Sequence, residues 1–431
     1  MADFAVKAGA LLLASDAAAA EVVEAMLAVA KQAGIENVSV DVTYSELTFS
    51  YRPDNGVPYT RIQTIHQRTF NYGKLTDVLG LVERFCQGQL TISEAEAELS
   101  SITTSPGPYP WWLTRLAAGF AGGSAALVFG SGWVVILAAF VANIVLDYLF
   151  GVLARHHWLT FYMQAMAGVI AVLAAVVIHV IDLSIDSSRV VVSVIIVMLA
   201  GMTSTGAIQD ALTGWYVTAL ARLFEAVMNT IGLIVGIVFG ILVANRLGVD
   251  LSISANVSMG SLQLPVILLA SAFAAIGFSF VAQNPPRILL PTALLSAIRY
   301  AVYLAAGAAQ LGSVWSSAAA AFVIGLIAVL YTQWFKAAAA AFAICAILPL
   351  LPGVLLYQGL LGINGLTSLV NALGTALALA GGLTFGEYVM SVLWRGLRLV
   401  ENRFFAPLFA QPFASQHRKS GRGKEEKESS D

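Results

Sequence analysis

PGPYPWWLTRLAAGFAGGSAALVF, residues 106–129, is the stretch in which the composition of the chain changes from mixed polarity to strongly apolar. The 105 residues before it are of mixed polarity. After it, from Trp111 to Trp394, only 15 of 284 residues are Lys, Arg, Asp or Glu, and apolar runs follow one another with short breaks. A water-soluble fold of that length cannot carry so few charged residues, so this part of the chain is predicted to lie in lipid.

Composition and charge narrow the class further. The mean hydropathy of +0.80 is typical of a multi-spanning membrane protein. Residues 1–110 hold seven basic and thirteen acidic side chains, and this acidic balance argues against binding of nucleic acid. Asp3, Lys7 and Asp16 interrupt the start of the chain, which is therefore not expected to be a signal peptide. Cys86 and Cys345 are interpreted as packing residues.

Ten apolar segments are long enough to cross a bilayer, which takes about 20 residues in a helix. The predicted spans are 112–129, 133–153, 158–181, 190–208, 218–244, 264–282, 288–307, 314–332, 338–361 and 366–393. All eight tryptophans fall at or near the ends of these segments, where the membrane interface favours them. The expected fold is therefore a multi-spanning α-helical membrane protein.

The distribution of basic residues predicts the orientation. With the N-terminus inside, the inner ends of the spans carry Arg115, Arg155, Arg222, Arg287, Lys336, Arg395, Arg398 and Arg403. The outer loops carry only Arg189 and Arg246, accompanied by three Asp residues. This bias favours the cell membrane with both termini in the cytoplasm.

The spans divide into two sets of five, residues 112–246 and 262–394. Because five is odd, a second set with the same fold must be inserted upside down, which is the inverted-repeat plan of many secondary transporters. Glycines or alanines recur at spacing four in the fifth and tenth spans, and such stripes let helices approach closely in lipid. The residues are Gly232, Gly236, Gly240, Gly374, Ala378, Gly382 and Gly386.

Helix-breaking residues occupy matched places in the fourth and ninth spans. The fourth ends in Gly201-Met202-Thr203-Ser204-Thr205-Gly206, followed by Gln209 and Asp210, and the ninth contains Pro349, Pro352 and Gly353. Interrupted helices free backbone N–H and C=O groups that can hold a polar substrate, although a proline can also merely kink a helix. A mid-membrane cavity is therefore predicted between these segments.

The first 105 residues are predicted to form a cytosolic α+β domain. The sequence predicts helix over residues 4–34, with Ser15 or Asp16 as an N-cap. Strands are expected at 38–42, 47–51 and 60–66. Helices follow at 75–87 and 93–102, the second opening with a capping box from Ser93 to Glu96. A proline-rich linker, 106–111, leads into the membrane, and 395–431 form a basic cytosolic tail expected to be disordered at its end.

Several stretches resemble the threonine/serine exporter family. They include GALLLASDAAAAEV, NVSVDVTYSELTFSY, GAIQDALTGWYVTALARLFE, PRILLPTALLSAIRY and ILPLLPGVLLYQGL. The resemblance covers residues 5–393 and implies ten spans, a cytosolic N-terminal domain and proton-driven efflux of small hydroxy amino acids. Family members often carry a Pro-Gly break in the fourth span, where this chain has Ser204-Thr205-Gly206.

Ionisable residues inside spans are costly and therefore mark candidate functional positions. Asp210 is an anion for a substrate ammonium, a proton carrier or a helix N-cap; Arg222 and Glu225 can also simply neutralise each other. Arg299 is the natural partner for a substrate carboxylate. The candidate substrate-binding residues are Thr203, Ser204, Thr205, Gln209, Asp210, Arg299, Pro352 and Gly353. The candidate proton carriers are Asp147, Asp210, Glu225 and Glu387.

Three hypotheses of function remain open at this point. The first is a secondary exporter of threonine and serine, coupled to protons and not an enzyme; the second is an exporter of small dicarboxylates or another metabolite. The third makes the N-terminal domain a hydrolase or ligand sensor, using Asp41, Thr43, Tyr44, Ser45, Glu46 and His66. No cofactor, metal-ligand spacing or P-loop is found, and a homo-oligomer is possible.

Overall fold

The computed structural model describes residues 1–35, 37–52, 56–182, 185–195, 201–249, 251, 263–347 and 365–396. Pro352 and Gly353, expected at the break of the ninth span, lie outside the described residues. So does almost all of the predicted tail, from residue 397 onward.

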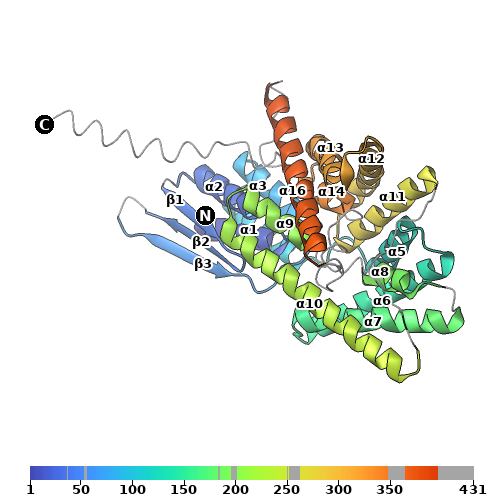
Figure 1. Ribbon diagram of the computed structural model, residues 1–431. Helices are drawn as coiled ribbons and strands as arrows, with labels where there is room; N and C mark the ends of the chain where they lie inside the picture. Colours follow the sequence, from blue (N-terminus) through green and yellow to red (C-terminus); the bar gives the residue numbers. More distant parts are fainter. Residues whose placement is uncertain are drawn as a thin grey trace.

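The N-terminal region is a three-stranded antiparallel sheet with helices packed on it (Figure 1). The strands pair in the order β1-β2-β3, as three successive runs rich in β-branched and aromatic residues predict. The core lies between the sheet and the helices. The elements are α1 (Ala2–Ala14), α2 (Ala19–Gln32), β1 (Val38–Val42), β2 (Glu46–Tyr51), β3 (Tyr59–Thr64), α3 (Tyr72–Cys86) and α4 (Ile92–Thr104).

Three local expectations for this region are corrected. The helical stretch expected over 4–34 is two helices, because Asp16 adopts a left-handed backbone conformation, φ 68°, that a helix cannot contain. The N-cap of the second helix is Ala18, not Ser15 or Asp16 as expected. The capping box of α4 is formed by Thr91 and Glu94 rather than by Ser93 and Glu96. Thr91 is the residue whose backbone is extended just before the helix, so it and not Ser93 meets the free N–H groups.

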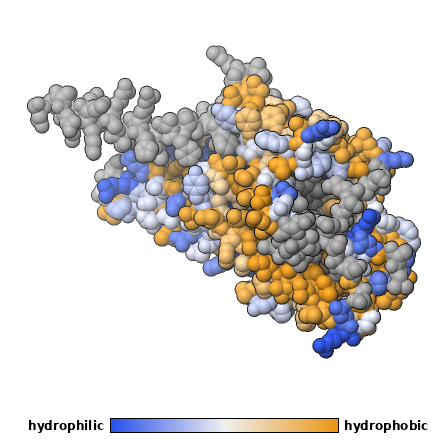
Figure 2. Space-filling model, viewed as in Figure 1, coloured by the Kyte–Doolittle hydropathy of each residue, from blue (hydrophilic) through white to orange (hydrophobic). Residues whose placement is uncertain are grey.

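The rest of the described chain is helical. Its elements are α5 (Trp111–Val128), α6 (Trp133–Arg155), α7 (Thr160–Ile181), α8 (Ser187–Ile195), α9 (Gly201–Leu212), α10 (Tyr216–Arg246), α11 (Leu264–Val281), η1 (Pro286–Ile288), α12 (Leu289–Ala308), α13 (Gly312–Phe335), α14 (Ala339–Ile347) and α16 (Gly365–Gly396). Leu137, Val141 and Val145 form an exposed apolar stripe on α6. Figure 2 shows such hydrophobic side chains gathered over the long helices.

Seven helical segments of the described chain are long and apolar enough to cross a membrane. They are α6, α7, α10, α11, η1 with α12, α13 and α16, so the chain is a multi-span membrane protein. The expected spans at 112–129, 190–208 and 338–361 are not among them. The expected span at 288–307 is, because Pro291 lies in the first turn of α12, where no intrahelical N–H is needed.

The helices on either side of residue 250 contact one another in the same pattern. The closest pairs are α7 with α10 and α13 with α16. A Cβ placed on Gly168 of α7 would lie 2.3 Å from the carbonyl oxygen of Leu233 in α10. A Cβ on Gly325 of α13 would lie 2.3 Å from the carbonyl oxygen of Leu383 in α16. Glycine at both places lets the two backbones touch.

Helices α5 and α11 join the two sets. The rings of Phe120 and Phe273 stack edge to face with centroids 5.5 Å apart. Gly277, near the end of α11, packs on the backbone of Ala117 near the start of α5. Toward the other end, Val128 of α5 shares a hydrophobic cluster with Ile267 of α11. The two helices therefore run antiparallel.

The N-terminal domain is docked onto the ends of helices from both sets. Tyr72 donates its backbone N–H to the carbonyl of Ala282 at 3.0 Å, just after α11. The N–H of Ala338, just before α14, donates to the hydroxyl of Thr76 at 3.3 Å. One continuous hydrophobic core runs from the domain into α13, α14 and α16. The domain is thus part of the same packed body as the membrane helices.

Candidate functional site

Arg222, six residues after the start of α10, is the centre of a buried ionic cluster. Its Nη1 donates to Oδ2 of Asp210 in α9 at 2.8 Å, and its Nη2 donates to Asp16 of the N-terminal domain. Only 4% of the Arg222 side chain is exposed, and none of Asp210. In such surroundings a carboxylate and a guanidinium hold each other strongly, because removal of either leaves a desolvated charge.

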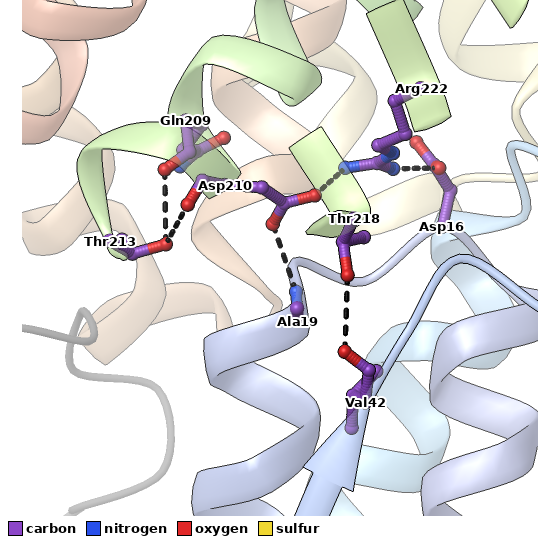
Figure 3. Close-up of polar contacts among 8 residues, drawn as sticks. All are labelled: Asp16, Ala19, Val42, Gln209, Asp210, Thr213, Thr218 and Arg222. Carbon is purple, nitrogen blue, oxygen red and sulfur yellow. Dashed lines mark hydrogen bonds and ion pairs between the residues drawn. The ribbon is translucent and has the colours of Figure 1, made fainter. Parts of the chain in front are cut away.

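Asp210 has a second partner across the same junction. Its Oδ1 accepts a hydrogen bond from the backbone N–H of Ala19 at 3.0 Å, in the first turn of α2 (Figure 3). The first N–H groups of a helix have no intrahelical acceptor, and the helix dipole is positive there. Asp210 therefore caps α2, a helix of the N-terminal domain. One alternative from the sequence was that it caps the helix that follows it in the chain.

The same junction decides what Arg222 and Glu225 do. The sequence left open that Arg222 and Glu225 neutralise each other. In the structure, the ion pairs of Arg222 are instead with Asp210 and Asp16. Glu225, one turn further along α10, accepts a hydrogen bond from the Tyr44 hydroxyl of the N-terminal domain. Thr218 adds a third link, donating its hydroxyl to the carbonyl of Val42 at 3.1 Å (Figure 3).

The polar residues of the fourth span lie in a regular helix. The expectation of an interruption over 201–206 is wrong, because residues 201–212 form the helix α9. Ser204 and Thr205 are buried. Ile208 of this helix packs against Ala376 and Ala380 of α16, so α9 lies between α10 and α16.

Arg299 lies wholly inside the packed helices, with no exposed surface. Its Nη2 donates to Oγ of Ser271 in α11 at 2.8 Å, and its guanidinium lies 5.4 Å from the ring centre of Tyr300. Ser271 and Ser296 also bond to each other, with their oxygens 2.8 Å apart. Within the described chain, Nη1 of Arg299 has no hydrogen-bond partner, and no Asp or Glu lies within ion-pair distance. This arrangement presents an unmatched cation and hydroxyl groups.

Two carboxylates expected in the spans differ in their surroundings. Glu387 of α16 is only 5% exposed and lies within electrostatic range of Glu21 in α2. Asp147 of α6 is 30% exposed and is paired with Arg115 at 4.0 Å. Arg115 in turn stacks on Trp111, an aromatic residue at the start of α5. Glu387 is thus a buried carboxyl group near a second one, while Asp147 is a partly exposed ion pair.

Sequence reasoning missed the part that the N-terminal domain plays in the cluster. Asp16 was identified only as a possible helix cap, and Arg68 was not singled out. Arg68 lies 5.1 Å above the ring of Tyr44 and within electrostatic range of Asp16 and Asp210. Nothing local in the sequence distinguishes these residues from ordinary surface charges.

Metal binding is not indicated in the part of the chain that the structure describes, where no group of three or more His, Cys, Asp or Glu residues could hold an ion.

Asp210, Arg222 and Glu225 are brought together at one junction. Arg299 lies apart from them, in α12, and Asp147 in α6.

Comparisons with known proteins agree with the resemblance found from sequence. The family described as "Putative threonine/serine exporter" matches residues 3–244, and the one described as "Threonine/Serine exporter, ThrE" matches residues 267–393. A Mycobacterium tuberculosis protein named "Probable threonine/serine exporter" is 31% identical over 93% of this chain and 78% of its own length. The "Threonine/serine exporter" of Corynebacterium glutamicum is 28% identical over 94% of this chain and 85% of its own. No solved structure matches. The chain belongs to the threonine/serine exporter family, which is a family of transporters and not of enzymes.

Proposed function

We propose that this protein is a secondary active exporter of threonine and serine driven by the proton gradient. The observation that carries the proposal is Arg299, a fully buried guanidinium beside two serine hydroxyls, whose Nη1 has no hydrogen-bond partner among the described residues. A buried cation is costly without a counter-charge, and a guanidinium binds a carboxylate through two parallel hydrogen bonds. The carboxylate of an amino acid supplies that counter-charge, and serine hydroxyls suit a substrate that carries its own hydroxyl.

The remaining substrate contacts are assigned to the fourth and ninth spans. Thr203, Ser204, Thr205 and Gln209 of α9 offer hydroxyl and amide groups. Pro352 and Gly353 stay proposed as backbone contacts. Asp210 stays proposed as the anion for the ammonium group, but only in a transport state in which it and Arg299 lie closer together than here, and it would have to exchange its bond to Ala19 for the substrate. The substrate would then compete with the N-terminal domain for the same carboxylate.

Proton coupling is proposed to use Glu387 first and Asp210 second, with Asp147 and Glu225 as weaker candidates. Glu387 is buried and lies within electrostatic range of Glu21, and both features favour its protonated form until its access to water changes. A proton on Asp210 would weaken both its ion pair with Arg222 and its contact with α2. Proton binding at that residue would thus loosen the N-terminal domain from α9 and α10.

The proposed architecture is ten spans in two inverted repeats. In support, each helix pair of the first set has a counterpart in the second: α5 and α6 with α11 and α12, and α7 and α10 with α13 and α16. The antiparallel contact of α5 with α11 is what a two-fold axis in the membrane plane requires. Helices α8 and α9 would supply the fourth span, and α14 the start of the ninth.

Both termini are proposed to lie in the cytoplasm. The N-terminal domain contacts the chain near residues 210–222, 282–283 and 338–345. The charge distribution predicts all of these on the inner face. A domain that touched an outer loop would speak against this arrangement.

Proteoliposomes test the function directly. Vesicles loaded with unlabelled threonine should accumulate labelled threonine and serine by counterflow, while succinate should not exchange. A pH gradient should drive net threonine movement, and a protonophore should abolish it. Exchange of succinate in preference to threonine would establish the dicarboxylate alternative, and a lack of response to the pH gradient would exclude proton coupling.

A further inference from the structure

Arg115, near the start of α5, packs on two aromatic rings at the outer surface of the helices. The central carbon of its guanidinium lies 4.5 Å from the ring centre of Trp111 and 4.8 Å from that of Tyr148 in α6. Trp111 and Tyr148 are 67% and 53% exposed. A planar guanidinium over aromatic rings is held in a fixed orientation, while the N–H groups at its edge can still donate.

The place of Arg115 follows from the close antiparallel contact of α5 and α6. A Cβ on Gly119 would lie 2.7 Å from the carbonyl oxygen of Phe140. One on Gly123 would lie 3.3 Å from the carbonyl oxygen of Ile136. Each turn toward the start of α5 thus meets a turn nearer the end of α6. Arg115 stands one turn before Gly119, so its contacts fall in the last turns of α6.

The N–H groups of Arg115 are not hydrogen-bonded to any of the described residues. Its ion pair there is with Asp147, whose Oδ2 lies 4.0 Å from Nε, too far for a hydrogen bond. A guanidinium is a fork of donors, two of which can bind one carboxylate or phosphate group. The rings therefore hold Arg115 in place, and its donors remain available to an acceptor from outside the chain.

The charges at this end of the helices do not balance. Between Trp111 and Ile181 the Lys, Arg, Asp and Glu residues are Arg115, Asp147 and Arg155. Arg155, the last residue of α6, is exposed and forms no ion pair within the described part of the chain. Two cations face one anion, so one positive charge is in surplus.

An apolar stripe runs from these charges along the outer side of α6. Its exposed residues recur at spacings of four and three, so they lie on one helix face; they are Leu137, Val141, Val145 and Tyr148. Arg155 continues the same face two turns later. Among the seven candidate spans, α6 is the least buried within the protein. This α6 stripe is therefore a surface for lipid that ends in a cation.

Exposed aromatic residues place this end of the helices at the boundary between membrane and water. Trp112 precedes Arg115 in α5, and Trp158 and Tyr162 lie around the start of α7. All three are about half exposed, at 51%, 48% and 55%. Trp and Tyr favour the level of the lipid headgroups. A cation at that depth meets phosphate groups, whereas the α6 stripe meets acyl chains.

We infer that Arg115 binds the headgroup of an anionic phospholipid whose acyl chains lie along the α6 stripe. Its guanidinium donates two parallel N–H bonds to the phosphate oxygens. Trp111 and Tyr148 orient it, and Arg155 adds attraction from the side nearer to water. A headgroup with a net negative charge, such as phosphatidylglycerol, matches the surplus charge. Phosphatidylcholine carries a balancing cation of its own and leaves the surplus unmatched.

The preference for one lipid over the other is measured on the purified full-length protein in neutral detergent. Native mass spectrometry gives the dissociation constants of phosphatidylglycerol and phosphatidylcholine. The parent should prefer phosphatidylglycerol, and Arg115→Met should reduce that preference about 10-fold.

Arg189→Met is the matched control. Arg189 is a partly buried arginine 3.9 Å from an aspartate oxygen, but it packs on no aromatic ring of the described chain. The control should keep the parent preference. The same preference in the parent and in Arg115→Met would overturn the site.

Asp147→Asn separates headgroup binding from a purely structural role of Arg115. Asparagine removes the carboxylate that competes for the guanidinium, so phosphatidylglycerol should bind more tightly than to the parent. An arginine that only joins α5 to α6 gives unchanged or weaker binding, and that result would contradict the inference. Arg115→Lys keeps the charge but lacks the planar fork, so its preference should lie between those of the parent and Arg115→Met.

Two further measurements cover misfolding and free anions. If Arg115→Met does not fold, Arg155→Met, at an exposed position, should fold and lose preference about fivefold; no loss would count against the site. Phosphatidylglycerol should raise the melting temperature of the parent more than that of Arg155→Met. Inorganic phosphate should not displace the lipid, because it has no acyl chains to lie on the α6 stripe. Displacement would show that the site takes a free anion, and the assignment to a lipid would be wrong.

Discussion

The carboxylate of Asp210 lies 3.0 Å from the backbone nitrogen of Ala19, so a residue of α9 caps the first turn of α2. The same carboxylate holds Arg222, which also holds Asp16. An acidic residue that the sequence places in the membrane half is thus the attachment point of the N-terminal domain. If Asp210 also has the roles proposed above, then substrate binding, proton binding and docking of the domain compete for one side chain.

Asp210→Asn should weaken docking and export together. Loss of the charge removes the ion pair to Arg222, at a cost of about 3–5 kcal/mol for a buried pair. We expect proton-driven threonine efflux to fall far more than protein abundance, and cleavage of the linker at 106–110 by protease to become faster. Asp186→Asn, at an exposed pair with Arg189 at 3.9 Å, is the control and should resemble the parent. Parent-like efflux and cleavage in Asp210→Asn would show that the carboxylate has neither role.

Glu387→Gln should separate coupling from translocation. A glutamine has the shape of the protonated acid but cannot release a proton, so net efflux driven by a pH gradient should be lost. Exchange of labelled for unlabelled threonine should persist, since no net proton movement is needed. Asp147→Asn, made in parallel, should have the smaller effect because Asp147 is partly exposed and paired with Arg115. Parent rates of net efflux in Glu387→Gln would exclude this residue as the proton carrier.

Arg299→Met should abolish tight substrate binding while the protein stays folded. A charge-assisted hydrogen bond contributes about 1.5–3 kcal/mol, which is roughly a 10- to 100-fold loss of affinity. The apolar side chain fits the buried position and removes a cation with an unpaired Nη1, so the melting temperature should not fall. The half-saturating threonine concentration in counterflow measures the effect. An unchanged value would place the substrate carboxylate elsewhere.

Glu21→Gln should flatten the pH dependence of stability. Burial, and the charge of Glu24, raise the pKa of Glu21 from 4.5 to about 7. The folded protein therefore holds this proton more tightly than the unfolded chain, so the stabilisation is complete below pH 4.5 and is lost as the pH rises through 7. We expect the melting temperature of the parent to fall between pH 5 and pH 8.

The glutamine variant should lose less over that range, with about 1–3 kcal/mol of stability at stake. Glu96→Gln, at an exposed position of α4, should keep the parent profile. Identical profiles for Glu21→Gln and the parent would show that another group controls this pH dependence.

Gly236→Ala and Gly386→Ala should damage the two halves alike. The added Cβ would lie 1.7 Å from the carbonyl oxygen of Ala165 and 2.2 Å from that of Phe322, so each helix pair must separate. Overpacking of this kind costs about 1–3 kcal/mol. Abundance and efflux should both fall, while Gly381→Ala, with no atom within 4 Å, should not change them. Full tolerance of either alanine would contradict the close crossing of these helices.

Local patterns were sufficient to predict the strands and most of the apolar helices. Alternation at period two and apolar runs of about 20 residues are patterns of neighbouring residues, so they can be recognised without the tertiary structure. The stripes of small residues could also be recognised in the sequence, because a spacing of four places them on one helix face. Placement of the capping box failed by two residues, since it depends on which residue is extended before the helix.

The partners of the charged residues could not be predicted in this way. Ala19 and Asp210 are 191 positions apart, and Asp16 and Arg222 are 206 apart. Sequence spacing favoured a pair between Arg222 and Glu225 because they share one helix face. Tertiary packing brings the turn between α1 and α2 against α9 and α10, so Arg222 pairs with Asp16 and Asp210 instead. Burial strengthens the attraction between neighbouring opposite charges, so the charges that lie nearest in space form the pairs. The sequence alone determined, through hydrophobicity, that the chain is a multi-span membrane protein. Only the tertiary structure decided which charges meet, because such contacts depend on distance in space.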